Sequence, residues 1–265
     1  STDHDVGYHA LVNECWNDVK CGDIYDPLNN GSNSILVTDG TTEVADFALD
    51  DAVVISGTII ATSGGAPIQG VYLDLFDDQG NYQGGGETAA DGTYKIVVPG
   101  PGDYYVVTPP WGLPSPYLPE VWEDKPCNLD VGCDFVAVGT AIPVDGSSVG
   151  GKNFSLESGF TMSGTVLDNG APVENIGVCV HYKSTGEFTG VCGGTDGAGN
   201  YTTGALPPSN DYMAYAVGYE RGYKEQVYDG MDCPPEGCDL NSGTQIDLSS
   251  SDASGIDFNL TNSDP

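Results

Sequence analysis

Apolar and polar positions alternate in short runs along most of the chain. Residues 71–76 (Val-Tyr-Leu-Asp-Leu-Phe) and 94–98 (Tyr-Lys-Ile-Val-Val) show the two-residue period and the β-branched side chains of strands. Turn residues separate such runs, as at 79–81 (Gln-Gly-Asn). The run at 104–107 ends at Pro109 and Pro110, which cannot donate ladder hydrogen bonds. The pattern predicts strands throughout, and no amphipathic stretch is long enough to predict a helix.

The pattern also repeats along the chain. Residues 55–58 (Ile-Ser-Gly-Thr) match 162–165 (Met-Ser-Gly-Thr), and a Pro-led strand, an Asp-Gly turn before a tyrosine and an Asp-Tyr strand follow in both copies. Each copy contains about seven short strands with turns every 8–12 residues or so, and this pattern predicts an antiparallel β-sandwich. We therefore expect an all-β chain of tandem sandwiches, with one unit over 51–157 and another over 158–265.

The closing part of the repeat occurs a third time, near the N-terminus. Residues 14–18 (Glu-Cys-Trp-Asn-Asp) match 120–124 (Glu-Val-Trp-Glu-Asp), and 46–49 (Asp-Phe-Ala-Leu) match 153–156 and 257–260. Residues 1–50 thus form an incomplete repeat, which cannot bury its own apolar face. It belongs to a longer array, docks as an irregular cap, or exchanges strands with a neighbouring subunit. The candidate assembly residues are Ile35, Leu36, Val37, Phe47 and Leu49.

This order of signals resembles the carboxypeptidase-regulatory-like family, also described as transthyretin-like, Ig-like or collagen-adhesin B-type modules. The resemblance covers residues 55–108 and 162–218. The tail of each repeat, with its cysteine pair, is similar to variants found in tandem arrays of bacterial surface proteins. Such modules serve as stalks, spacers and adhesive repeats, so the resemblance implies a fold and no catalysis.

The net charge of −32, from 39 acidic and 7 basic residues, limits the kinds of partner that the chain can bind. Such a surface repels nucleic-acid phosphates and anionic lipid, so we expect neither nucleic acid nor membrane insertion. No signal peptide or transmembrane run stands out. Gly 38 and Pro 17 suit many tight turns, and an apolar fraction of 39% argues against disorder.

The even number of cysteines, eight, predicts disulfides and an oxidising, extracellular location. A metal site would need further ligands, and the chain has only three histidines. Cys179 and Cys192 flank a turn at 183–186, which favours a cross-strand bond. The other expected pairs are Cys15–Cys21, Cys127–Cys133 and Cys233–Cys238.

Carboxylates and asparagines supply further candidate sites. Asp77, Asp78, Asp91 and Asp196 could offer oxygen ligands to Ca²⁺, but no twelve-residue calcium loop is present, and tight turns explain these residues better. No other cofactor is expected. Four asparagines match the N-glycosylation pattern, namely Asn30, Asn153, Asn200 and Asn259.

An aromatic-rich subset can be interpreted in two ways. Exposed rings would stack on sugars, whereas buried rings would pack a core or a domain junction. Recurrence of Trp16 and Trp122, with Tyr228 in the third copy, favours packing. The subset comprises Trp16, Trp111, Trp122, Tyr104, Tyr105 and Tyr117.

No nucleophile–base arrangement occurs, and the opening strands lack the lysine that an isopeptide cross-link to Asn153 would require, so no enzyme is expected. The favoured function is a structural subunit of an extracellular fibre or surface stalk, joined to copies of itself or to adjacent repeats through residues 1–50. The alternatives are a glycan-binding adhesin module and an accessory domain of a larger secreted protein.

Overall fold

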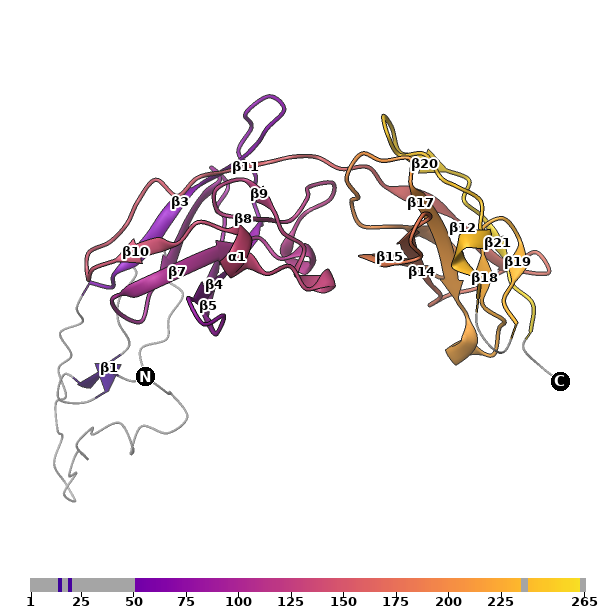
Figure 1. Ribbon diagram of the computed structural model, residues 1–265, viewed down its shortest axis with the longest axis horizontal. Coiled ribbons are helices and arrows are strands. Elements are labelled where there is room, and N and C mark those ends of the chain that lie inside the picture. Colours follow the sequence, from indigo (N-terminus) through magenta and orange to yellow (C-terminus); the bar gives the residue numbers. More distant parts are fainter. Residues whose placement is uncertain (1–13, 16–18, 21–50, 235–237, 263–265) are drawn as a thin grey trace, which may run out of the picture.

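The structure is a computed structural model that describes residues 14–15, 19–20, 51–234 and 238–262 (Figure 1). It is an all-β chain of two β-sandwiches joined by one short linker. Each sandwich has its own apolar core, one drawn from residues 55–156 and the other from 162–260. Within the described part of the chain, no helix has the length and apolar character needed to cross a membrane.

The first sandwich packs a three-stranded sheet against a larger one. Ile55 and Ile59 of its opening strand β3 (Val54–Ala61) are fully buried, and Leu73 and Leu75 face them from the other sheet. The small sheet has the order β11-β3-β6, and the larger has the order β5-β4-β7-β8-β9 with β10 also on β7. The remaining strands are β4 (Tyr72–Asp77), β5 (Tyr82–Glu87), β6 (Thr93–Val97), β7 (Gly102–Val107), β8 (Glu120–Val121), β9 (Lys125–Pro126), β10 (Ile142–Val144) and β11 (Phe154–Leu156).

The second sandwich repeats this plan. Its opening strand β12 (Met162–Asp168) buries Met162 and Val166, and a second sheet of order β15-β14-β17-β18-β19 covers them. The other strands are β13 (Ala171–Pro172), β14 (Gly177–Tyr182), β15 (Phe188–Gly194), β16 (Asn200–Thr202), β17 (Tyr212–Val217), β18 (Gln226–Val227), β19 (Met231–Asp232), β20 (Ala253–Ser254) and β21 (Phe258–Asn259).

The end of each sandwich departs from the purely antiparallel pairing that we expected. Strand β11 lies parallel to β3, with Phe154 opposite Ile59 and Leu156 opposite Ala61. Strands β20 and β21 lie parallel to β12 in the same way. The reason is that the closing strand arrives by a long crossover from the other sheet rather than by a hairpin, and only a crossover permits parallel neighbours.

A hairpin of two short strands, each two residues long, recurs at intervals of 106 residues and begins at residues 14, 120 and 226. Strand β1 (Glu14–Cys15) pairs with β2 (Val19–Lys20) in the register Glu14 opposite Lys20. In β8–β9 Glu120 lies opposite Pro126, and in β18–β19 Gln226 lies opposite Asp232. The described part of the incomplete repeat therefore has the same strand pairing as its two counterparts.

The few helical turns are short and connect strands. The α-helix α1 (Phe135–Val138) is capped by the Asp134 side chain, which accepts from the backbone N–H of Ala137. Such a length gives too few residues for a periodic sequence signal, so these turns were not predicted. The 3₁₀ turns are η1 (Pro110–Gly112), η2 (Leu129–Val131), η3 (Tyr219–Arg221) and η4 (Leu240–Ser242).

Candidate functional site

The junction between the two sandwiches is where side chains of both units converge. Its linker is hydrogen-bonded on both sides: Leu118 N–H donates to the Glu157 carbonyl at 3.0 Å, and Gly159 N–H donates to the Pro116 carbonyl at 2.8 Å. On the other side, Phe160 and Leu206 exchange backbone hydrogen bonds of 2.9 and 2.8 Å. Because the linker pairs with both units, it defines their separation more tightly than a free tether would.

Small residues allow the junction to close. A Cβ on Gly159 would lie 2.5 Å from the Leu206 carbonyl oxygen and 2.7 Å from Leu118 Cδ2. A Cβ on Gly190 of β15 would lie 2.8 Å from Asn128 Nδ2, whose amide donates to the Thr189 carbonyl at 3.3 Å. The 3₁₀ turn η2 of the first sandwich thus rests directly on β15 of the second.

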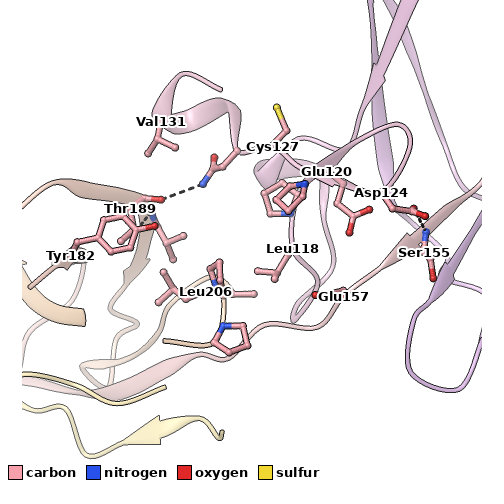
Figure 2. A pocket seen from close by; sticks show the side chains of 17 residues that line it. Leu118, Glu120, Asp124, Cys127, Val131, Ser155, Glu157, Tyr182, Thr189 and Leu206 are labelled. Atoms are coloured by element: carbon pink, nitrogen blue, oxygen red, sulfur yellow. Dashed lines mark hydrogen bonds between the residues drawn. The ribbon is translucent and has the colours of Figure 1, made fainter. Parts of the chain in front are cut away.

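A cavity of about 370 Å³ lies within this junction (Figure 2). Tyr182, Thr189 and Leu206 of the second sandwich face it from one side, and Glu120 and Asp124 of the first from the other. Its volume is in the range of ligand pockets, although its lining is mostly aliphatic and proline.

Glu120 is the most unusual residue of this cavity. Its side chain is only 5% exposed, and Oε2 has no hydrogen-bond partner in the described structure. Burial raises the pKa of this carboxyl to about 7, and the Asp124 carboxylate adds to the rise. A backbone hydrogen bond from Glu157 opposes it, while the Glu157 carboxylate raises the pKa further. The group can therefore change charge near neutral pH.

The equivalent residue of the second sandwich shows what Glu120 lacks. Gln226 is 3% exposed, and its Nε2 donates to Asp232 Oδ1 at 2.9 Å and to the Asn259 carbonyl at 3.2 Å. Its Oε1 accepts from the Asn259 N–H at 3.3 Å. A neutral amide is thus fully paired at a position where the first sandwich carries an acid. The match of residues 14–18 with 120–124 contained Glu120, but the burial of its side chain gives no local sequence signal.

A second crevice, of about 430 Å³, lies at the edge of the junction. Trp111 of η1 is 65% exposed there and packs against Tyr72 with the two rings tilted by 46° and their centroids 5.2 Å apart. Phe188 of β15, 41% exposed, lines the crevice from the second sandwich. Asn128 and Asp130 supply polar groups.

The other aromatic candidates are less exposed than Trp111. Tyr104 and Tyr105 are buried, and Tyr117 and Trp122 pack half-buried against the first core. Lys152 Nζ lies 4.0 Å from the Trp122 ring centroid, which covers that ring with a cation. Packing thus explains most of the subset, and Trp111 is the exposed member. Trp16 lies outside the described residues.

The structure joins Cys127 to Cys133, Cys179 to Cys192, and Cys233 to Cys238. Cys179 and Cys192 are register partners on β14 and β15, so their bond crosses a hairpin. The Cys127–Cys133 bond closes the segment that carries η2, and it thereby holds the turn that contacts the second sandwich. The expected partner of Cys15, Cys21, lies outside the described residues.

The remaining predicted site residues lie at the surface or outside the described residues. Asn153, Asn200 and Asn259 are exposed, as attachment of a glycan would require. Asn30 lies outside the described residues, as do the proposed assembly residues Ile35, Leu36, Val37, Phe47 and Leu49.

The candidate calcium ligands serve their own turns. Asp77 Oδ1 accepts from the backbone N–H groups of Gln79 and Asn81, and Asp91 Oδ1 accepts from that of Thr93. Asp196 Oδ1 accepts from the backbone N–H groups of Ala198 and Asn200. Across residues 51–234 and 238–262, no group of three or more His, Cys, Asp or Glu side chains is placed to share a metal ion.

No protein-family model and no curated protein matches the chain. Among solved structures, it is similar to the Bacillus anthracis TIE protein, with 14% identity over 87% of this chain and 38% of that one, at a TM-score of 0.32. It is also similar to a streptococcal ancillary pilin, with 11% identity over 73% of this chain and 64% of that one, at a TM-score of 0.35. The shaft pilin SpaA of Lactobacillus rhamnosus GG is similar with 11% identity over 77% of this chain and 96% of that one, at a TM-score of 0.30.

Proposed function

We propose that the chain is a structural segment of a secreted or surface-attached fibre or stalk, built from tandem sandwiches that resist stretching. The observation that supports this proposal best is the pairing between the first and last strands of each sandwich. We call this pairing the closing clamp, formed by residues 54–62 with 149–156 in the first sandwich and by 161–167 with 252–260 in the second.

The closing clamp of the first sandwich extends well beyond the three residues of β11. Val149 N–H donates to the Val54 carbonyl at 2.8 Å, and Ser56 N–H donates back to the Val149 carbonyl at 2.9 Å. Further along, Thr62 N–H donates to the Leu156 carbonyl at 3.0 Å. Hydrogen bonds thus join the two segments along their whole length.

Side chains reinforce the same clamp. Asn153 Oδ1 accepts from both the N–H and the Oγ1 of Thr58, at 3.0 and 3.1 Å. The hydroxyl of Tyr94 donates to the Lys152 carbonyl at 2.5 Å. A Cβ on Gly57 would overlap the Lys152 carbonyl oxygen, so glycine permits this close approach.

The second sandwich repeats each of these features with different residues. Asp257 Oδ1 accepts from the N–H and Oγ1 of Thr165 at 2.8 and 2.9 Å, and the Tyr201 hydroxyl donates to the Ile256 carbonyl at 2.6 Å. Gly164 stands where its Cβ would overlap that same carbonyl. The clamp is therefore a feature of the repeat and not of one unit.

The direction of the strands determines how the clamp carries tension. The chain enters the first sandwich at Val54 and leaves it at Leu156, and the two strands run parallel. Pulling the ends apart draws the strands past each other, so all the clamp hydrogen bonds are loaded in shear at once. An antiparallel pair pulled at its open end would lose its bonds one by one. Forced unfolding is governed by the unfolding rate, which this arrangement lowers.

Single-molecule stretching of the chain tests this proposal. We expect Asn153→Ala to lower the unfolding force of the first sandwich, because it removes two hydrogen bonds from the clamp. Asp91→Ala is the matched control: Asp91 Oδ1 also accepts from a threonine N–H and Oγ1, at 3.0 and 2.7 Å, but in a turn outside the clamp. Equal effects of the two variants on unfolding force would contradict a role for the clamp.

The way in which segments are joined is part of the same proposal. The β1–β2 hairpin shares its register with the two later hairpins, which supports residues 1–50 being the closing part of a repeat that also needs opening strands. Strand exchange with another copy would supply them. We expect deletion of residues 1–50 to abolish polymers seen by electron microscopy. Polymers of the same form after deletion would eliminate strand exchange.

A further inference from the structure

We propose that the crevice at the edge of the junction binds an uncharged oligosaccharide, with Trp111 as the stacking platform. The crevice is the space of about 430 Å³ lined by Trp111 and Tyr117 of the first sandwich and by Phe188 of the second. This property is independent of the resistance to stretching proposed above.

Trp111 is held in place although its ring is exposed. It stands on a 3₁₀ turn that begins at Pro110, a residue whose ring fixes the backbone φ angle. A Cβ on the neighbouring Gly112 would lie 2.5 Å from Tyr72 Cβ, so the turn packs closely on β4. Because the turn packs on β4 and the indole packs on the Tyr72 ring, the indole loses little conformational entropy when a ligand covers it.

The polar groups of the crevice suit a sugar. Asn128 uses Oδ1 to accept from the Asp130 N–H and one Nδ2 hydrogen to reach the Thr189 carbonyl, which leaves a second amide hydrogen to donate. The exposed Asp130 carboxylate can accept from hydroxyl groups. Aromatic faces with a few convergent donors and acceptors match the alternating C–H faces and hydroxyl rims of a pyranose ring.

The charge of the chain selects among sugars. With a net charge of −32 and Asp130 in the lining, the crevice repels sialic acids, uronic acids and sulfated sugars. The ligand class is therefore an oligosaccharide of uncharged hexoses or N-acetylhexosamines.

A glycan array with neutral and anionic oligosaccharides, probed with the full chain, tests the proposal. We expect binding to neutral members, and titration calorimetry with the strongest of them should show that Trp111→Ala weakens binding by about tenfold or more. Phe188→Ala should also weaken it, because the crevice is two-sided. Trp111→Phe, which keeps an aromatic face, should recover part of the affinity.

Tyr219→Ala is the matched control, because Tyr219 is 71% exposed on η3, at the corresponding place after β17, and is not among the crevice residues. This variant should bind like the unaltered chain, and thermal unfolding should show that all four variants are folded. The proposal is overturned if no neutral glycan binds, if anionic glycans bind best, or if Trp111→Ala or Phe188→Ala leaves affinity unchanged. Loss of binding in Tyr219→Ala would also overturn it.

Discussion

At the scale of single residues, Glu120 and Gln226 occupy one position of the repeat with different chemistry. Both are buried, but the amide has partners for its donors and its acceptor while one carboxyl oxygen has none. The acid is therefore more easily accommodated protonated than charged. Its pKa, about 7 in the folded chain against 4.5 as the ordinary value, expresses that preference.

The sign of the pH dependence follows from this shift. Between pH 4.5 and 7 the folded state holds a proton on Glu120 that the unfolded state has released, so stability falls as pH rises through this window. Four other carboxyls, those of Asp77, Asp91, Asp196 and Asp247, have lowered pKa values because of hydrogen bonds. Their stabilisation is complete above about pH 4 and disappears only at lower pH. Burial also raises the pKa of the Asp74 carboxyl, so a substitution of Glu120 itself is needed to isolate its contribution between pH 5 and pH 8.

We predict that Glu120→Gln, which copies the second sandwich, stabilises the chain at pH 8 by about 1–2 kcal/mol after allowance for solvent screening beside the cavity. At pH 5 the variant and the unaltered chain should differ little. Urea unfolding at both pH values measures this. The exposed Glu220→Gln is the control and should change neither value. An identical pH dependence for Glu120→Gln and the unaltered chain would rule out this explanation.

At the scale of elements, the hairpin β14–β15 combines a register pair with a covalent bond. The sequence separation of Cys179 and Cys192 is 13 residues, and a loop of this size is worth about 3 kcal/mol in the chain-entropy model. We predict that replacing both residues with serine destabilises the second sandwich by about this amount, measured by urea unfolding.

A companion variant keeps this prediction specific. Replacing Cys127 and Cys133 with serine opens a bond in the first sandwich alone, with a separation of 6 residues. It should lower the stability of that unit by more than it lowers the stability of the second unit, which the bond reaches through η2. If both double variants affected both units equally, the disulfides would not act locally.

Most strands could be predicted from the sequence because they alternate. Residues 71–76 and 94–98 were predicted as strands and overlap β4 and β6 to within one residue at each end. The direction of the closing strand could not be predicted, because alternation says which face a residue occupies but nothing about the neighbouring strand. The side-chain pair Thr58 and Asn153 lies 95 residues apart and likewise leaves no local signal.

At the scale of the whole molecule, the junction determines the relation between units. Gly159 lies in the linker, where an added Cβ would lie 2.5 Å from the Leu206 carbonyl oxygen and 2.7 Å from Leu118 Cδ2. We predict that Gly159→Ala loosens the junction, because the added methyl group must push one of these neighbours away. Small-angle X-ray scattering should show a broader distribution of distances, with little change in thermal unfolding.

Gly177→Ala is the control for this experiment, since nothing lies within 4 Å of the added Cβ. Its scattering curve should match that of the unaltered chain. An unchanged curve for Gly159→Ala would mean that the junction adapts without opening. The junction itself could not be predicted from the sequence, because residues such as Leu118 and Leu206 read as ordinary strand or loop positions until two units meet.

The shortness of the linker has a consequence for how the chain folds. The closing strand β11 ends at Leu156, and β12, which carries the same Ser-Gly-Thr motif as β3, begins at Met162. The correct partner of β11, strand β3, is far away in sequence, whereas the incorrect partner β12 follows closely. Parallel neighbours, however, need a crossover of about a dozen residues or more. The few residues between β11 and β12 are too short for that, so the linker excludes the mispaired product that tandem copies would otherwise favour.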